Sequence, residues 1–411
     1  MMSDDARYVE TRVEKHVIRE INPYYQMLRC YCHRAKNLYN RTNFVVRHQF
    51  IENNKWLRYF DLDKMIRSEF IDYRLMPTAQ TAQQLIKNLD AAWSAFFRSI
   101  KDWSKNKDKY NGKPKMPKYL KTDGYYPVTI PNQACKIKNG VLNFPRAFYG
   151  FQVHTKCQDR SDFISFQQIR IVPKMRRVVI EVIYKIRVVC EKTDNGRYIG
   201  IDTGVDNLAA AANNFGAPAF VVNGRPVKSI NQFYNKMIAH YSSVTKMMNH
   251  RDFSKRMQRI AIKRSNKLND YLHKASRYIV DWCAEHDVCK IIIGKNVNMK
   301  NGISLSHKVN QSFVQIPFYS LISMIQYKAR EIGVAVVTTE ESYTSGTSFI
   351  DDEMPVKENY NNKRRVHRGL FMSNDGISIN ADLNGAYQIM KKVVQLKWDS
   401  GCASHPVVVC F

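Results

Sequence analysis

Apolar positions recur at steps of three and four residues along the first quarter of the chain. Between residues 22 and 108 this spacing predicts helices. The clearest apolar stripe consists of Leu85, Leu89, Ala92, Trp93, Phe96, Phe97 and Ile100. The segment "NKDKYNGKPKMPKYLKTDGYYP" at 106–127 ends this pattern, because prolines do not continue a helix and clustered lysines repel one another in a core. We expect it to be a basic linker.

Short runs of β-branched and aromatic residues follow the linker and predict a small β-domain over roughly 124–195. In "RRVVIEVIYKIRVVC" at 176–190, alternation places Val178, Ile180, Val182 and Tyr184 on one face. The N-terminal run "YVETRVEKHVI" alternates in the same way. We therefore expect it to add a strand to this β-domain, with the helical segment inserted between.

From Tyr198 onward, strands are separated by long helices. Strands are predicted at "RYIGID", "NLAAAANN", "PAFVVN", "CKIIIG" and "VAVVTTEE", and helices over about 229–285 and 317–332. This order predicts an α/β domain with a mixed sheet.

Charge narrows the class of partner. The chain of 411 residues carries 64 Lys and Arg against 36 Asp and Glu, a net charge of +28, which indicates a polyanion and first of all a nucleic acid. An anionic membrane surface is the alternative, but no apolar run approaches the roughly 18 residues of a spanning helix. The opening "MMSDDARYVE" is unlike a signal or transit peptide, so we expect a soluble cytosolic protein.

Two basic stretches are candidates for phosphate contact, with a merely solvated face as the alternative. They are a helix face with Arg251, Lys255, Arg256, Arg259, Lys263, Arg264 and Lys267, and the linker lysines Lys113, Lys115 and Lys118.

The nine cysteines are an odd number with no Cys-x-x-Cys pair, which fits a reducing compartment. Only Cys283, His286 and Cys289 approach the spacing of metal ligands, and they lack a second ligand pair. We expect no zinc site.

Two carboxylates stand where strands or helices of the α/β domain begin or end. Asp202 ends the apolar strand "YIGID", where an unpaired charge costs several kcal/mol; a turn cap is its alternative role. Asp382, in "SINADLNGAYQIMKKV", stands where a helical pattern begins, so it could simply be the N-cap. Metal-dependent chemistry at these two carboxylates would normally use a third acid. The strand "KIIIGKN", where we would expect it, ends instead in Gly294 and Lys295.

An apolar strand ending in Asp and an Asp opening the last helix together resemble the layout of RNase H-like nucleases. Over nearly its whole length the chain resembles the TnpB family of transposon-encoded, RNA-guided nucleases, relatives of type V CRISPR effectors. The motifs that carry this resemblance are "CHRAKNLYNRTNFVVR" at 32–47, "GKPKMPKY" at 112–119, "GIDTGVDNLAA" at 200–210, "YLHKASRYIV" at 271–280, "NQSFVQIPF" at 310–318, "ESYTSGTS" at 341–348 and "INADLNGA" at 379–386.

The resemblance implies a multidomain α+β protein. Residues 1–21 and 124–195 would form a β-barrel wedge domain, 22–123 a helical recognition domain with the basic linker, and 196–411 a RuvC-like α/β nuclease domain. Residues 344–376 would be a degenerate target-nucleic-acid-binding insert.

The resemblance also implies partners and chemistry. These are a guide RNA, a double-stranded DNA target with a short flanking motif, and a ribonucleoprotein with one protein chain in the prokaryotic cytoplasm. Asp202 and Asp382 would be the first and last carboxylates holding two Mg²⁺ ions, or Mn²⁺, for phosphodiester hydrolysis.

The chain departs from the family pattern at two places. Gly294 stands where most relatives carry Glu, and residues 346–376 lack the two Cys-x-x-Cys pairs, so no zinc knuckle is expected there. The next strand ends in Glu340 and Glu341, about 4.8 Å away if the strands are parallel neighbours, so one of them could supply the third carboxylate. Because neighbouring strand residues face opposite ways, only one should reach the site.

Three alternatives remain open from the residues. The first is that Glu340 and Glu341 form an ordinary exposed strand end. Separately, Asp351, Asp352 and Glu353 are expected to be loop surface. The protein could be a nuclease-dead, RNA-guided DNA-binding protein that acts as a repressor. It could also be a structure-selective resolvase that uses no guide.

Overall fold

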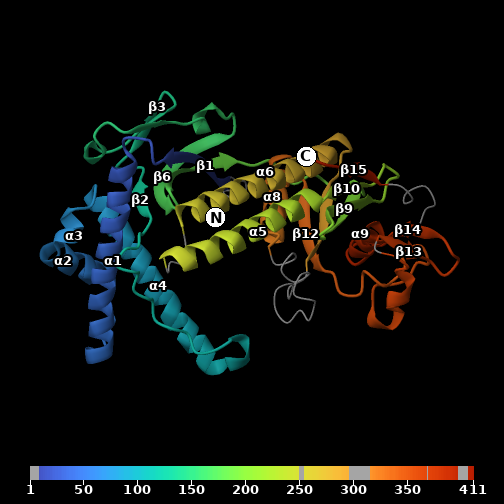
Figure 1. Cartoon of the computed structure of the whole chain (residues 1–411), viewed down its shortest axis with the longest axis horizontal. Helices are drawn as coiled ribbons and strands as arrows, with labels where there is room; N and C mark the ends of the chain where they lie inside the picture. Colours follow the sequence, from blue (N-terminus) through green and yellow to red (C-terminus); the bar gives the residue numbers. More distant parts are fainter. Residues whose placement is uncertain (1–8, 250–253, 296–314, 368, 397–405) are drawn as a thin grey trace. The chain divides into compact units, whose positions relative to one another are not determined.

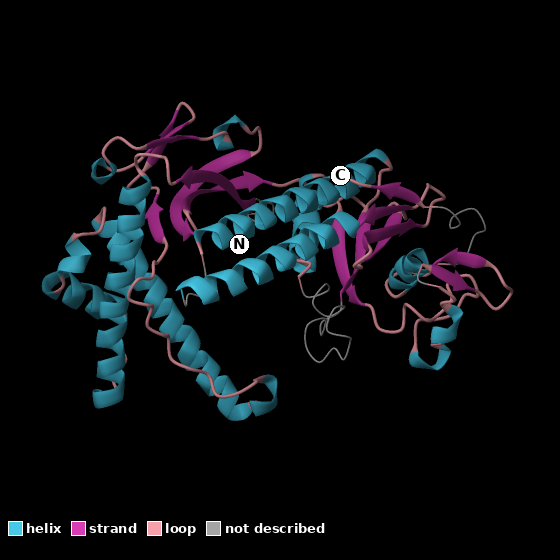
Figure 2. Ribbon diagram, in the orientation of Figure 1, coloured by secondary structure: helices cyan, strands magenta, loops and turns pink. Residues whose placement is uncertain are grey.

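The computed structural model describes residues 9–249, 254–295, 315–367, 369–396 and 406–411 (Figure 1). The chain forms two compact units, Met1–Arg187 and Val188–Phe411. Helices and strands occur in both units (Figure 2), as the α+β prediction requires. None of the helices in the described ranges is long and apolar enough to cross a membrane. The finer division into wedge, recognition and nuclease domains stays a prediction.

Four helices make up the helical part of the first unit: α1 (Tyr25–Asn53), α2 (Tyr59–Glu69), α3 (Ile71–Arg74) and α4 (Ala79–Lys105). α4 begins where the Thr78 hydroxyl accepts a 3.2 Å hydrogen bond from the Thr81 amide, a side-chain N-cap. The predicted apolar stripe is buried at Leu85, Leu89 and Trp93, but Ala92 is exposed.

Residues 106–127 connect α4 to β2, as the predicted basic linker does, and they are held along α1. Three side chains on one face of α1 donate to carbonyls of this segment: Lys36 Nζ to Thr122 at 2.6 Å, Asn40 Nδ2 to Leu120 at 2.9 Å, and Asn43 Nδ2 to Pro117 at 3.1 Å. The Leu120 amide returns a 2.8 Å bond to Asn40 Oδ1. Because prolines leave the segment's carbonyls without helical partners, polar side chains of α1 satisfy them and fix the segment on the helix.

The first unit contains two antiparallel sheets. The larger has the order β1-β7-β6-β2, and the smaller β3-β4-β5. Their strands are β1 (Val9–Arg19), β2 (Val128–Pro131), β3 (Lys136–Lys138), β4 (Val141–Asn143), β5 (Gln152–His154), β6 (Phe163–Lys174) and β7 (Arg177–Arg187). β1 pairs with β7 along its whole length, so the N-terminal run does join the β-region across the inserted helices. In β7 both faces are buried from Val178 to Tyr184, more than the simple alternation predicted.

The second unit is built on a six-stranded mixed sheet with the order β12-β11-β8-β9-β10-β15. The strands are β8 (Tyr198–Asp202), β9 (Asn207–Asn213), β10 (Phe220–Asn223), β11 (Lys290–Lys295), β12 (Ala335–Glu340) and β15 (Val407–Val409). β12, β11 and β8 run parallel, β9 is antiparallel to both of its neighbours, and β15 is parallel to β10. The predicted α/β domain with a mixed sheet is confirmed.

Helices cover both faces of this sheet. They are α5 (Arg225–Asn249), α6 (Lys255–Glu285), α8 (Phe318–Glu331) and α9 (Ala381–Lys391). Alternation along β11 sends Ile291 and Ile293 into the core shared with α6 and α8, and Ile292 into the core shared with α9. Figure 1 shows α5 and α6 as two long neighbouring helices of this unit.

A loop-rich segment with the hairpin β13 (Leu370–Met372) and β14 (Ser378–Asn380) lies between β12 and α9. Its acids form ion pairs: Asp351 and Glu353 lie deeper than the expected loop surface, whereas Asp352 is exposed, as expected. Asp351, with only 8% of its side chain exposed, and Glu353 flank Arg364 at 3.8 and 2.6 Å. Asp352 Oδ1 pairs with Lys391 Nζ of α9.

Candidate active site

Asp202 is the last residue of β8, and its side chain lies directly on helix α9. A Cβ added at Gly385 of α9 would stand 2.7 Å from Asp202 Oδ2, which is closer than real Cβ contacts. One layer deeper, a Cβ at Gly200 would stand 2.3 Å from the Ala386 carbonyl oxygen. The two glycines therefore let strand and helix approach without side chains between them, and this contact sets where the carboxylate lies.

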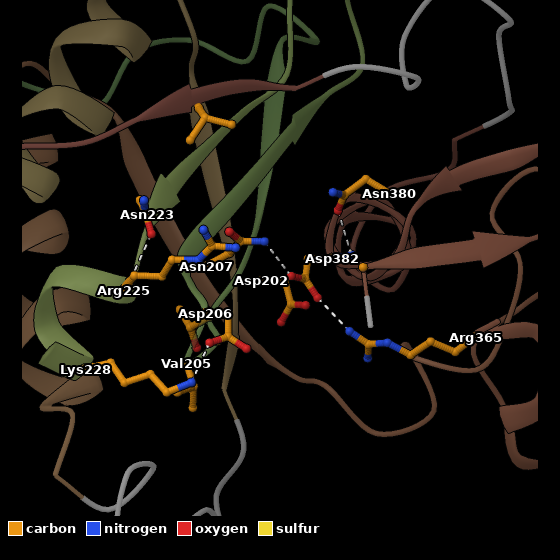
Figure 3. A pocket seen from close by; sticks show the side chains of 14 residues that line it. Asp202, Val205, Asp206, Asn207, Asn223, Arg225, Lys228, Arg365, Asn380 and Asp382 are labelled. Atoms are coloured by element: carbon orange, nitrogen blue, oxygen red, sulfur yellow. Dashed lines mark hydrogen bonds and ion pairs between the residues drawn. The ribbon is translucent and has the colours of Figure 1, made fainter. Parts of the chain in front are cut away.

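Asp382 is not the N-cap of α9. That role belongs to Asn380, whose Oδ1 accepts from the amides of Asp382 at 3.0 Å and Leu383 at 3.2 Å. The Asp382 carboxylate points instead into the site (Figure 3), where Oδ2 accepts from Asn207 Nδ2 at 2.7 Å and Oδ1 from Arg365 Nη2 at 2.9 Å. A capping role thus does not explain this acid.

Of the two acids at the end of β12, the structure brings Glu341 to the site. β11 and β12 are parallel neighbours, with Gly294 opposite Thr339 and Lys295 opposite Glu340. A Cβ on Gly294 would stand 3.1 Å from Glu341 Oε2. The Glu340 side chain is exposed, and its carbonyl accepts from Lys392 Nζ at 2.9 Å. The glycine at the end of β11 thus leaves room for a carboxylate from the neighbouring chain segment.

The pKa of Asp202 is raised well above its usual value. Burial is the main cause, followed by the negative charges of Glu341 and then Asp382. The Arg365 guanidinium and the Thr203 amide act in the opposite direction without reversing the shift. Three carboxylates from two strand ends and one helix start therefore act on one another electrostatically.

The donor chemistry of these three acids fits divalent metal ions. Hard cations such as Mg²⁺ prefer carboxylate oxygens, and a nearby positive ion would relieve the repulsion that raises the pKa of Asp202. The side chains are not closed around one point: within the described ranges no three His, Cys, Asp or Glu side chains form a ready-made metal cluster. Arg365 supplies the positive charge beside Asp382.

A cavity of about 730 Å³ opens beside Asp202 and Asp382 and has a polar, partly cationic lining (Figure 3). Arg225 and Lys228, at the start of α5, line it, and Lys228 Nζ pairs with Asp206 Oδ1 at 2.9 Å. The lining thus holds both acids and cations; Lys228 and Arg365 are paired with acids of the lining, and Arg225 adds a further cation.

The basic helix predicted from the sequence is α6, and its residues do not share one environment. Lys255, Arg256, Arg259, Lys263 and Lys267 are exposed, whereas Arg251 lies outside the described residues. Arg264 is engaged within the unit: its Nε donates to Asn231 Oδ1 at 2.7 Å, and its guanidinium stacks 4.7 Å from the Tyr234 ring centroid. Burial lowers the pKa of Arg264. We therefore keep the exposed five as candidate phosphate contacts and assign Arg264 to the α5–α6 contact.

Two further sequence predictions can be placed. Lys113, Lys115 and Lys118 are exposed on the segment that α1 holds, so their amines can reach a partner. Cys283 is buried in a core cluster, and burial raises the pKa of its thiol, so it is not poised to act as a thiolate ligand.

Sequence reasoning missed Asn207, Arg365 and Lys228. Asn207 lies in the motif "GIDTGVDNLAA", five residues after Asp202. Its contact with Asp382 depends on how β9 pairs with β8, which the motif alone does not show. Arg365 stands in the basic run "KRRVHR", where composition cannot say which cation turns inward. Lys228 carries no sequence signal that we recognise.

Two family models match the chain. One, OrfB_IS605, described as "Probable transposase", matches residues 181–300, and the other, "Cas12f1-like, TNB domain", matches residues 318–389. No curated protein matches the chain in sequence.

Solved structures of type V effectors align over most of the chain with low scores. A Cas12f1-sgRNA-target DNA complex is 15% identical over 92% of this chain and 98% of that one, with a TM-score of 0.38. Alicyclobacillus acidoterrestris C2c1 with single-guide RNA is 9% identical over 92% of this chain and 70% of that one, with a TM-score of 0.39. Scores of this size do not by themselves establish a shared fold. Residues 181–300 are therefore similar to the OrfB_IS605 family, and residues 318–389 to the TNB domain of Cas12f1-like proteins.

Proposed function

We propose that the protein is an RNA-guided DNA endonuclease that cleaves its target by metal-dependent phosphodiester hydrolysis. The observation that carries the proposal is the convergence of Asp202, Glu341 and Asp382 beside a cavity with a partly cationic lining. The TnpB-like and Cas12f1-like matches support the same reading at the level of the family.

Seven residues of the candidate site have defined roles in this proposal. Asp202, Glu341 and Asp382 would hold two Mg²⁺ ions, which when bound activate a water and stabilise the leaving oxygen. Asn207 and Arg365 fix the two oxygens of Asp382, so that this carboxylate keeps one orientation. Arg225 and Lys228 give a DNA phosphate a cationic wall beside the carboxylates.

The guide and target are proposed on charge and family. A net charge of +28, with exposed cations on α6 and on the segment 106–127, suits a long polyanion. We propose guide RNA and double-stranded DNA as partners, with a short flanking motif selecting the target. We also propose that the complex contains one protein chain.

Expression of the full chain with its own flanking DNA tests the proposal. We expect a defined RNA to co-purify and the complex to cut plasmid DNA that carries the RNA's match beside a randomised flank, with Mg²⁺ but not with EDTA. The Asp202→Ala and Asp382→Ala complexes should bind the same target without cutting it. Protein that purifies free of RNA, or an alanine variant that cuts at the normal rate, would contradict the proposal or that residue's role.

A second function has its own observation. Gly294 leaves β11 without an acid, and Arg365 already neutralises Asp382, as would suit a nuclease-dead, RNA-guided DNA-binding protein. That protein would bind the matched target tightly and leave it intact with every divalent ion tried. An unguided resolvase would instead cut branched DNA with no RNA present.

A further inference from the structure

A second cavity, in the helical part of the first unit, combines aromatic rings with cations. Its volume is about 770 Å³, within the range of ligand pockets. It lies between the start of α2 and the second half of α4, and none of the residues of the candidate active site lines it.

Aromatic rings form one part of the lining. Trp56 packs against Phe97 of α4 with ring centroids 4.7 Å apart, and Phe97 in turn contacts Trp93 of the core at 5.7 Å. Tyr59 and Phe60 follow at the start of α2, and Phe60 is 82% exposed. An exposed phenyl ring forgoes the stabilisation that its burial would contribute, so a ring at a cavity mouth is suited to covering a flat ligand.

Cations form the other part. Arg58 lies 4.3 Å from the centroid of the Trp56 ring, and Lys87 lies 5.0 Å from that of Tyr59. Arg98 and Lys101 extend the row along α4 at helical spacing, and both are exposed. Against these four cations stands one acid, Asp90, which pairs with Arg58 at 3.4 Å, so the lining carries a net charge of +3 (four minus one).

Trp56 adds a polar group that lacks an acceptor. Its Nε1 is buried, and no hydrogen-bond acceptor reaches it within the part of the chain that the structure describes. A buried donor without an acceptor is destabilising. A polar ligand atom at the edge of the Trp56 ring would offer the missing acceptor, whereas a base on the face of the ring would not, because the N–H lies in the ring plane.

We propose that this cavity holds one unpaired nucleotide of a bound nucleic acid. The base stacks on the exposed ring of Phe60, with Tyr59 and Trp56 beside it, and its flanking phosphates lie on Lys87, Arg98 and Lys101. Rings reach the face of a base only where that base has left its own stack, so the ligand is single-stranded or extruded at this point. The inference rests on the nucleic-acid binding of the proposed function, and it requires no cleavage.

The test uses the full chain and short single strands that carry 2-aminopurine at successive positions. One set is RNA and the other DNA of the same sequence, which distinguishes the two sources of nucleotide. Stacking should quench the fluorescence at one position. Phe60→Ala should abolish that quench and weaken binding by about 5- to 100-fold, the range expected for one stacked base. Phe233→Ala, which removes a ring that is 61% exposed on α5 and outside the cavity, serves as the control and should change neither.

Two further variants separate the groups of the cavity. Arg98→Gln with Lys101→Gln should lower the salt dependence of binding by about two phosphate contacts. Trp56→Phe keeps a ring and removes the donor, so it should retain most of the quench and lose affinity. The proposal is overturned if no position is quenched in either strand, or if Phe60→Ala binds like the unchanged chain. The unchanged chain could show the quench, and Phe60→Ala could lose it, although the protein never cuts DNA. That result would support the nucleotide site and would count only against the proposed nuclease activity.

Discussion

Glu341 Oε2 lies 3.1 Å from the point where a Cβ on Gly294 would stand. The glycine and the glutamate thus share one position at the ends of two parallel strands, β11 and β12. A side chain on Gly294 would crowd this carboxylate and would press more closely, at 2.5 Å, on Ile389 Cδ1. We propose that the acid missing from "KIIIGKN" is supplied by Glu341 at the end of the neighbouring strand.

Replacing Glu341 with Gln should abolish cleavage, because Gln keeps the size and removes the charge that a metal ion requires. We expect a loss of several orders of magnitude in the rate of target cutting, with target binding retained. Glu340→Gln is the matched control and should cut nearly normally, since its side chain is exposed. Equal activity of the two variants would remove Glu341 from the proposed site.

Gly294→Glu, combined with Glu341→Gln, should restore part of the lost cutting by returning an acid to the end of β11. The added Cβ would stand 2.5 Å from Ile389 Cδ1, the end of a flexible side chain, so Ile389→Val should improve the recovery. Single-turnover cleavage rates measure the rescue. Gly294→Gln in the same background is the control, and recovery there as well would mean that charge is not what was restored.

Asp202→Asn should make the metal-free protein more heat-stable, because it removes a charge that burial and two neighbouring carboxylates disfavour. Mg²⁺ should raise the melting temperature of the unchanged chain by roughly 5–10 °C at about 100 times its Kd, and that of the variant much less. Melting curves in EDTA and in Mg²⁺ measure both effects without any cleavage. Equal Mg²⁺ shifts in the two proteins would show that Asp202 holds no ion.

Lys328 of α8 should make the free energy of unfolding depend on pH, independently of the candidate active site. It is 4% exposed and donates to the His273 carbonyl and Ser276 Oγ, both at 2.7 Å; burial, and next Arg277, lower its pKa from 10.5 to about 8. Between these two values the unfolded chain binds more protons than the folded one, so stability should rise with pH from about 8 to 10.5.

Lys328→Met should remove that rise. Lys274→Met, on an exposed lysine of α6, should keep it. Denaturant unfolding of the three proteins at several pH values measures the difference. A rise of the same size in all three would show that Lys328 does not cause it.

Much of the second unit could be predicted from the sequence, because its strands are short apolar runs with clear ends. Asp202 ends its strand as expected, and the order of strands and helices follows the pattern. Which of Glu340 and Glu341 faces the site could not be predicted, since alternation separates them but does not say where β12 stops. The role of Asn380 could have been found: Asn caps helices as well as Asp does, and it stands two residues before Asp382.

Other features depended on contacts between distant segments. The docking of 106–127 on α1 requires the amides of Asn40 and Asn43 to face the segment's carbonyls, which composition does not reveal. Asp351 and Glu353 looked like loop acids because their partner, Arg364, stands in another part of the same insert.

Gly200 and Gly385 bring β8 and α9 into direct contact. As a result, the positions of the three acids of the candidate site are not equally free to vary. Asp202 and Asp382 are tied to two backbones that touch each other, so their separation cannot be tuned by repacking side chains between them. Glu341 follows β12, the outermost strand of the sheet, where one residue more or less disturbs no neighbour on the far side. Variation among such sites should therefore accumulate at the outermost strand, while the pair on β8 and α9 serves as the fixed reference against which a third acid can be gained, lost or exchanged.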